Sequence, residues 1–200
     1  MARRRPGRDA AEPPRRIIIA ARFLLLLLIA ALPARAAPLL PPDSRVELRA
    51  WGLGLIPFDG RFTRFHGWIR TDSGSPDGCQ VVLEVEAASL IMAETSVRDG
   101  ITGPEFMDVA QFPDLAFHGA CEGGRVTGSL LLHGQTHPFT LDSESSPSAN
   151  TLIFSGKLRR AEWGMTARPL TAGSTVRIRV AFPNPAPASA PDSPSGRPHT

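Results

Sequence analysis

The sequence predicts an all-β fold, an eight-stranded antiparallel barrel with a short helical insertion between its third and fourth strands. Three observations predict it. Apolar residues recur with a period of two, not 3.6, over most of the chain after residue 43. Glycine-rich turns separate the apolar stretches, and only one connection, residues 92–113, is too long for a hairpin. A sheet with one apolar face closes naturally into a barrel, because closure removes the exposed edges.

The predicted strands follow this alternation in order along the chain. In the first strand Val46 and Leu48 share one face, and the third strand has the same pattern at residues 81, 83 and 85. The second strand is less regular. Phe65 and Ile69 fall on one face, whereas the aromatic residues Phe62 and Trp68 fall on the other. The eight strands are expected at residues 44–52, 61–71, 79–90, 114–122, 125–133, 137–146, 150–160 and 174–182.

The clearest stretch is a three-stranded meander over residues 112–141. The chain reverses at Glu122-Gly123-Gly124, where glycine supplies the positive φ of a two-residue hairpin, and again at residues 134–136. The preceding long connection carries Val97 and Ile101 at helical spacing, which predicts a short helix that Gly103-Pro104 should interrupt. Arg98 and Asp99 are expected to form a local ion pair there.

Residues 1–36 have the pattern of a cleaved signal peptide. An arginine-rich start precedes a ten-residue apolar run, Phe23 to Leu32, and Ala34-Arg35-Ala36 is typical of a cleavage site. The alternative is a membrane anchor, but the run is half of the ~20 residues that a membrane-spanning helix needs. Arg15-Arg16 leaves both twin-arginine and general export open. We therefore expect a periplasmic protein with no stable membrane span after cleavage.

The charge balance argues against nucleic-acid binding. The chain has 22 Lys plus Arg and 19 Asp plus Glu, and residues 1–36 hold eight of the basic and two of the acidic residues. The remaining 14 basic and 17 acidic residues give a net charge of −3, without the basic patch that phosphate binding requires. The domain is expected at residues 37–182, followed by a disordered Pro/Ala/Ser-rich tail at 183–200.

Several motifs along the chain resemble the YceI-like family of small secreted, lipocalin-like barrels. They include Phe112-Pro113-x-x-x-Phe117, Val126-Thr127-Gly128-x-Leu130-x-Leu132-His133-Gly134 and Arg160-Ala161-Glu162-Trp163-Gly164-Met165. The resemblance covers roughly residues 43–182. It implies a barrel that binds polyisoprenoid-type or other long amphiphilic chains, and it makes a homodimer an expectation. Without it, the inward residues would favour an ordinary filled core.

The candidate ligand-binding residues are the apolar side chains predicted to face inward. They are Val46, Leu48, Phe65, Val81, Leu83, Val85, Phe117, Leu130, Leu132, Phe139, Leu141, Leu152, Phe154, Val176, Ile178 and Val180. Four glycines on the same faces (Gly67, Gly119, Gly128 and Gly156) are expected to leave room for a ligand. Cys79 and Cys121, at matching ends and faces of two strands, predict a disulfide, the alternative being two unrelated buried thiols.

No catalytic motif accompanies the serines and histidines. G-x-S-x-G, H-E-x-x-H and C-x-x-C are all missing from the sequence, and His133-x-x-x-His137 has no third metal ligand nearby. We expect no enzyme activity, no metal and no cofactor other than the bound lipid. The predicted function is an exported carrier that sequesters one elongated apolar ligand. The alternatives are an isoprenoid-quinone carrier serving a membrane redox partner, a ligand-free structural or stress-response barrel, and a lipid head-group enzyme.

Overall fold

A computed structural model describes residues 35–71, 78–148 and 150–184, and these residues form one antiparallel sheet with little helix. The all-β class is therefore confirmed. The strand segments are β1 (Arg35–Pro38), β2 (Arg45–Gly52), β3 (Ile56–Phe62), β4 (Phe65–Thr71), β5 (Cys79–Glu86), β6 (Leu90–Met92), β7 (Asp114–Glu122), β8 (Arg125–Leu132), β9 (Gln135–Glu144), β10 (Thr151–Arg159) and β11 (Thr175–Pro183). The helical segments are α2 (Thr95–Thr102) and the 3₁₀ turns η2 (Ala87–Ser89) and η3 (Arg160–Trp163).

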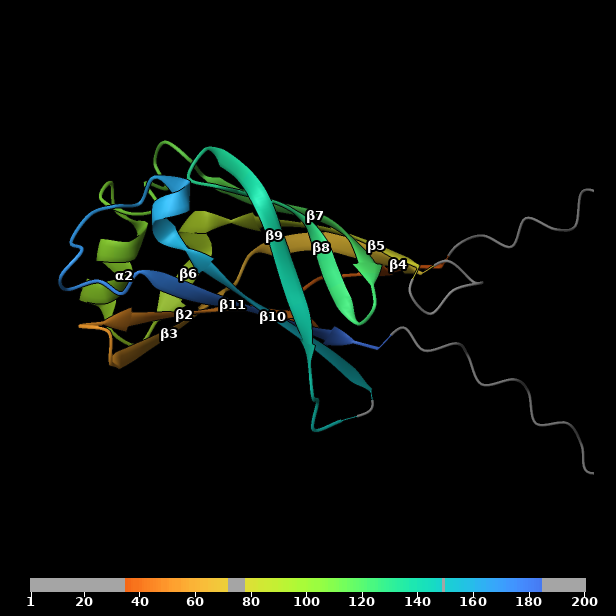
Figure 1. The fold of residues 1–200 in the computed structure, drawn as a ribbon. Coiled ribbons are helices and arrows are strands. Elements are labelled where there is room, and N and C mark those ends of the chain that lie inside the picture. Colours follow the sequence, from red (N-terminus) through yellow and green to blue (C-terminus); the bar gives the residue numbers. More distant parts are fainter. Residues whose placement is uncertain (1–34, 72–77, 149, 185–200) are drawn as a thin grey trace, which may run out of the picture. The chain divides into compact units, whose positions relative to one another are not determined.

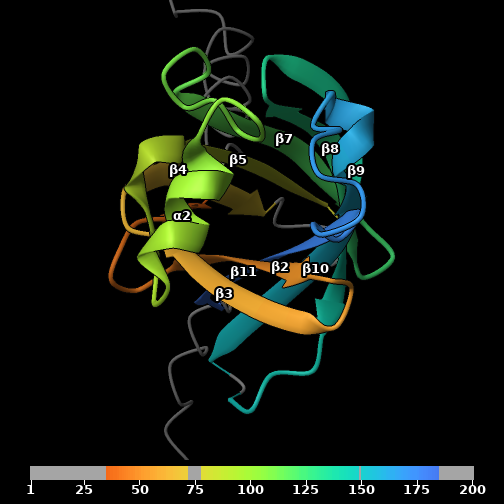
Figure 2. The same ribbon diagram turned by 90° about the vertical axis from the view of Figure 1, so that its left-hand side faces the viewer.

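Within the described ranges, these eleven segments make up eight long strands and the short β1. Only Thr63 and Arg64 separate β3 from β4, and only η2 separates β5 from β6. β3 pairs with β6 and with β2, while β5 pairs with β4 and with β7. The remaining neighbours run β7-β8-β9-β10-β11-β2, so the circuit closes on itself. Figure 2 shows the strands arranged around a common centre, with α2 in front.

The bend between β3 and β4 explains the irregular second strand. Phe62 ends β3 and Phe65 begins β4, and both residues are buried, at 4% and 6% exposure. In an uninterrupted strand, residues three apart would lie on opposite faces, and only one of the two rings could point inward. The two intervening residues interrupt the alternation, so each half directs its own aromatic ring inward. Trp68 instead lies on the outer face, where the Arg70 guanidinium stacks on its ring at 4.9 Å.

Both turns of the meander have the geometry that glycine allows. Gly123 and Gly124 have φ of +56° and +77° and join β7 to β8, as predicted. The second turn lies at His133-Gly134, with φ of +50° and +68°, so β9 begins at Gln135 rather than at residue 137. The turn predicted at residues 134–136 thus begins one residue earlier in the structure and ends two residues earlier, because a positive φ at a residue other than glycine is uncommon and is not expected from the sequence.

The predicted helical insertion is present. α2 ends at Thr102, and Gly103 caps it before Pro104, which has no N–H to continue the helix. The Arg98 and Asp99 side chains form the expected local ion pair. In Figure 1, α2 and the segment after β10 lie at one end of the sheet, and the β7–β8 turn lies at the other. No helix in the described ranges is long and apolar enough to cross a membrane.

A disulfide joins β5 to β7 at the end of the sheet opposite α2. Cys79 and Cys121 are paired as predicted, with their Cα atoms 4.8 Å apart. The register between the strands places Gln80 opposite Ala120, so one residue further along the ladder the two cysteines lie directly opposite each other. Short β1 pairs with β4 at this same end, where Ala36 lies opposite Arg70. The predicted signal peptide lies outside the described residues except for 35 and 36, and the predicted tail does so except for 183 and 184.

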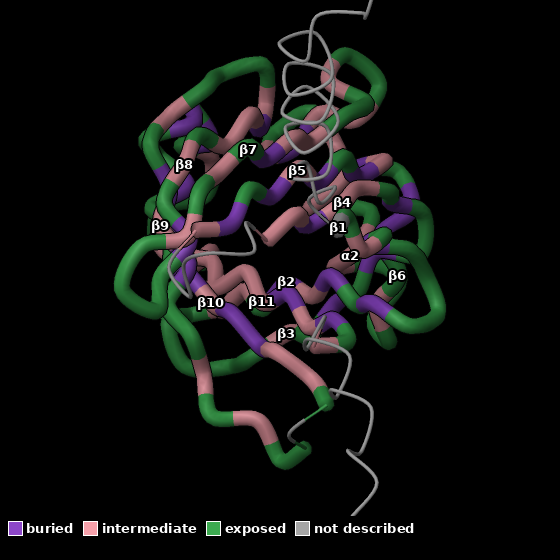
Figure 3. Tube along the Cα trace, turned by 90° about the vertical axis from the view of Figure 1, so that its right-hand side faces the viewer, coloured by how far each residue is buried: buried purple, intermediate pink, exposed green. Residues whose placement is uncertain are grey.

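Buried and exposed residues alternate along the strands, as the tube in Figure 3 shows for β5 and β2. The inward residues form one apolar core, which includes Trp163 at 1% exposure. Trp163 donates its indole N–H to the Leu130 carbonyl at 3.3 Å.

Arg179 links three strands on the outer face, and this gives a pH prediction. Its guanidinium contacts Glu47 and Glu144, each at 3.1 Å, and Ser155 Oγ donates to Glu144 at 2.5 Å. The Ser155 hydrogen bond, followed by Arg179, holds the pKa of Glu144 below its usual value. A carboxyl with a lowered folded-state pKa stabilises the fold at neutral pH, and this contribution is lost as the pH falls through that pKa.

Glu144→Gln should therefore make the melting temperature depend less steeply on pH in the acid range. The change should be small, because the ion pair is partly exposed. Identical slopes for both proteins between pH 7 and pH ~3 would contradict this assignment.

Candidate ligand-binding cavity

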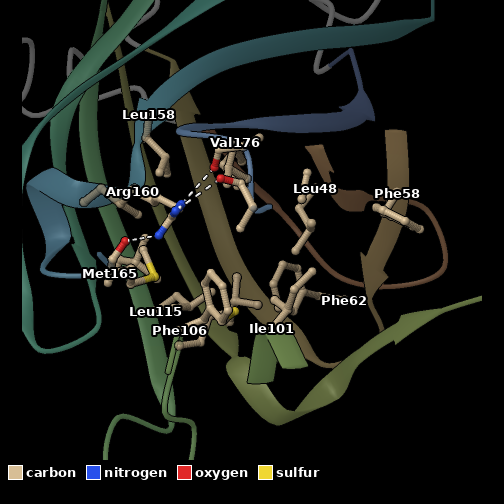
Figure 4. A pocket seen from close by; sticks show the side chains of 18 of the residues that line it. Leu48, Phe58, Phe62, Ile101, Phe106, Leu115, Leu158, Arg160, Met165 and Val176 are labelled. Atoms are coloured by element: carbon tan, nitrogen blue, oxygen red, sulfur yellow. Dashed lines mark hydrogen bonds between the residues drawn. The ribbon is translucent and has the colours of Figure 1, made fainter. Parts of the chain in front are cut away.

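The curled sheet encloses an apolar cavity of about 510 Å³ at the end covered by α2. Its walls are inward side chains of β2, β5, β7, β8, β9 and β11, and its mouth is bordered by α2 and by residues 160–173. Figure 4 shows Leu48, Phe62 and Ile101 on one side of this space and Leu158 and Met165 on the other. The lining contains no Asp, Glu, His or Cys side chain.

Most of the sequence-predicted ligand residues line this cavity. Twelve of the sixteen do so: Val46, Leu48, Leu83, Val85, Phe117, Leu130, Leu132, Phe139, Leu141, Val176, Ile178 and Val180. They come together because the strand register places their faces inside one closed circuit. Val46, for example, lies opposite both Val180 on β11 and Phe62 on β3. That these twelve residues contact a ligand stays a prediction, and the cavity is where the contact is expected.

The other four predicted residues lie elsewhere. Phe65 and Val81 are buried in the packed core, and Leu152 and Phe154 lie near the start of β10, away from the mouth. Phe154 stacks on Phe182, with ring centroids 5.8 Å apart and planes 9° from parallel. The alternation predicts which face of the sheet a residue lies on, but not its position along the barrel axis. Where these four residues lie, side chains fill the interior of the barrel.

The inward glycines do not make room for a ligand, contrary to the expectation. None of Gly67, Gly119, Gly128 and Gly156 lines the cavity. A Cβ on Gly67, Gly128 or Gly156 would meet backbone atoms of the neighbouring strand, and a Cβ on Gly119 would lie 2.8 Å from the Phe117 ring. These glycines therefore permit close strand approach and aromatic packing.

The residues at the mouth were not among those predicted to contact a ligand. α2 contributes Val97, Gly100 and Ile101, and the segment that follows contributes Phe106 and Met107. Small residues elsewhere on the lining (Ala50, Gly52, Ala116, Ala172 and Gly173) leave the space that was assigned to the inward glycines. The spacing of Val97 and Ile101 was the available signal, because residues four apart share a helix face.

Arg160 is the one buried cation on the cavity wall, among the described residues. Its guanidinium donates to three backbone carbonyls, of Met165, Ala172 and Gly173, the last two at 3.2 and 2.8 Å. The Phe106 ring covers one face, with its centroid 5.3 Å from Cζ. Burial lowers the pKa of Arg160, yet an arginine side chain stays protonated in proteins. In the sequence, Arg160 stands out only as part of the motif Arg160-Ala161-Glu162-Trp163-Gly164-Met165.

An ion pair crosses the mouth of the cavity. Arg168 Nε lies 2.6 Å from Glu105 Oε2, and both side chains are exposed. Arg168 belongs to the segment after η3, and Glu105 to the segment after α2, so the pair connects the two borders of the opening. Exposed pairs of this kind contribute little to stability.

The two histidines with metal-like spacing have separate partners. His133 Nδ1 lies 2.8 Å from the Trp163 carbonyl, whereas His137 Nε2 lies 3.2 Å from Gln135 Oε1, and its ring packs edge-on against Trp163. Across the described ranges, no group of three or more His, Cys, Asp or Glu side chains is arranged to hold a metal ion.

A closed antiparallel sheet around an apolar cavity is the architecture of lipocalin-like barrels. Residues 39–183 match the family model of the YceI-like domain, and the chain belongs to this family. The resemblance found in the motifs is thereby confirmed.

Relatives and solved structures agree with this assignment. A UPF0312 protein of Pseudomonas savastanoi pv. phaseolicola is 28% identical over 102 residues, 48% of this chain and 53% of the relative. A UPF0312 protein of Pseudomonas fluorescens is 26% identical over 144 residues, 68% of this chain and 70% of the relative. The chain thus spans about half the length of the first of these curated relatives.

Two solved structures share the fold. BcnA of Burkholderia cenocepacia superposes with a TM-score of 0.53 at 19% identity, covering 69% of this chain and 94% of that one. A polyisoprenoid binding domain from Saccharophagus degradans, implicated in plant cell wall breakdown, superposes with a TM-score of 0.50 at 15% identity, covering 74% and 97%. At these identities the likeness concerns the fold alone.

Proposed function

We propose that this protein is an exported carrier that binds one elongated apolar molecule, an isoprenoid lipid or a related amphiphile, inside its barrel. The observation that carries the proposal is the apolar cavity of about 510 Å³. Its volume lies within the range of known small-molecule sites, about 300–1,000 Å³. Support also comes from the polyisoprenoid binding domain that shares the fold. Export to the periplasm rests on the signal-peptide pattern of residues 1–36.

Apolar burial would supply the binding energy. At about 25 cal/mol per Å², ~400 Å² of ligand chain removed from water corresponds to roughly 10 kcal/mol before the costs of association are subtracted. A carrier needs no reaction. The described lining residues include the hydroxyls of Ser96 and Thr171 but no carboxylate, imidazole or thiol that could serve as their general base. The proposal therefore favours binding over turnover of a lipid head group.

Native mass spectrometry of protein purified from its own host tests this function. We expect a mass increment of one lipid per chain, which organic extraction removes and identifies. The same spectrum reports the oligomeric state, which bears on the proposed homodimer. A protein that arrives without a lipid and takes up none from host extracts would contradict the carrier function and favour a ligand-free barrel.

Filling the cavity should abolish lipid binding without unfolding the protein. A Cβ on Gly100 meets no atom within 4 Å, and Ala50 lines the part of the cavity wall that β2 forms. Gly100→Phe and Ala50→Phe should each reduce the lipid-bound fraction at least about tenfold, because each places a ring of several Å in the space that the ligand chain needs. His118→Phe, on the exposed face of β7, is the matched control. Full lipid content in both cavity variants would mean that the lipid binds outside this cavity.

A further inference from the structure

Arg160 is 94% buried, with 6% of its surface exposed, and it lines a cavity whose other walls are almost wholly apolar. Charged side chains are seldom buried this far without an opposite charge, because removing an ion from water is costly. No carboxylate in the described part of the chain lies within ion-pair distance of it. The charge is therefore solvated by the protein but not neutralised by it.

Two exposed arginines of the same domain differ from Arg160 in this respect. Arg49 pairs with Asp59, and Arg64 with Glu86, on surfaces where water would already solvate the charges. Arg160 is thus a buried guanidinium without a counterion, whereas these two exposed guanidiniums each have one. Its three carbonyl contacts use three of its five N–H groups, which leaves two donors on Nη1 and Nη2.

The position of Arg160 suits the end of a bound chain rather than its middle. It follows β10 and lies beside Met165 and Ala172, in the segment that borders the opening, as Figure 4 shows for Met165 and the carbonyl oxygens. The apolar walls formed by the strands extend from there into the barrel. A head group at Arg160 would thus leave the hydrocarbon chain within those walls.

We propose that the natural ligand carries an anionic oxygen head group, a carboxylate or a phosphate, that pairs with Arg160 at the mouth of the cavity while its apolar chain fills the barrel. This inference rests on the proposed function. A planar guanidinium matches such oxyanions with two parallel, charge-assisted hydrogen bonds. Arg168, already paired with Glu105 at the rim, is not required.

Matched probes that differ only in the head group test the inference. Delipidated protein is titrated with geranylgeranyl phosphate, geranylgeraniol, oleate and oleyl alcohol, and the dissociation constants are compared within each pair. Each anion should bind at least about tenfold more tightly than its alcohol, as expected for hydrogen bonds to a charged group. If only one anion is preferred, the head group is assigned to that class.

Variants separate recognition by Arg160 from its support of the loop. Arg160→Gln should remove the preference for anions while the alcohols still bind, and Arg160→Lys should keep part of it. Arg159→Gln, at the exposed neighbouring arginine that does not line the cavity, should leave the preference unchanged. Thermal unfolding of each variant reports any structural loss, and the preference of the unaltered protein is informative even if Arg160→Gln fails to fold.

The outcomes distinguish this inference from the function on which it rests. Equal affinity for anions and alcohols in the unaltered protein would overturn the anionic head group but keep the carrier, and would favour a neutral head group such as a quinone. An anion preference that persists in folded Arg160→Gln would also overturn it. Failure of all four probes and of host lipids to bind would instead contradict the carrier function.

Discussion

Removal of the Cys79–Cys121 disulfide is expected to lower the free energy of unfolding by about 4 kcal/mol. The two cysteines are 42 residues apart in sequence. Cross-linking a loop of this length restricts the unfolded chain, and the chain-entropy relation gives about 4 kcal/mol for it. Such a loss is a large share of the ~5–15 kcal/mol by which domains are usually stable. The bond also fixes β5 against β7 at the end of the sheet opposite the cavity.

The comparison that checks this uses the double variant Cys79→Ser/Cys121→Ser and the oxidised protein. Urea unfolding should show the lower midpoint for the variant, and reductant should shift only the unaltered protein. Thiol titration of denatured protein provides the control, with no reactive thiol until reductant is added. Two thiols without reductant, or equal midpoints, would contradict the prediction. Lipid content should change little in the folded variant, because neither cysteine lines the cavity.

The strands and the disulfide could be predicted because both depend on local alternation. A period of two gives the face of each residue, and the hairpins between β7, β8 and β9 then determine the pairing. Cys79 and Cys121 shared a face and an end, which is what a cross-strand disulfide requires. The same alternation brought together most of the apolar walls, including Val46 and Val180.

The mouth of the cavity could not be predicted in this way. Residues 92–113 and 160–174 do not alternate, so apart from the helical spacing of Val97 and Ile101 nothing in their sequence indicates which side chains face the barrel. Arg160 reads as an ordinary surface arginine beside Arg159, and only the fold shows that the first is buried and the second exposed. The prediction that the inward glycines leave room for a ligand was wrong for a different reason. An inward glycine leaves space only if no neighbouring chain occupies it, and that depends on how tightly the sheet is coiled.

Because some glycines have a neighbouring strand against them and others have open space, the same substitution at two glycines should have opposite effects on stability. Gly128 lies opposite Gly119 across the β7–β8 ladder, and a Cβ on it would lie 2.5 Å from the Gly119 Cα and closer still to the His118 carbonyl. Backbone atoms cannot rotate away, so Gly128→Ala must push the strands apart and should cost about 3 kcal/mol. Gly100 lies in α2 with open space around its Cβ, so Gly100→Ala should stabilise the protein by about 0.5–1 kcal/mol through helix propensity.

Urea unfolding of the two alanine variants beside the unaltered protein measures both signs under one set of conditions. Because the chemical change is one methyl group in each case, the difference between the variants reports the space around each glycine rather than the residue type. A neutral or stabilising Gly128→Ala would mean that room exists between β7 and β8. The cavity would then extend toward the disulfide end, and a ligand chain could reach further into the barrel than the packing of Phe117 over Gly119 allows.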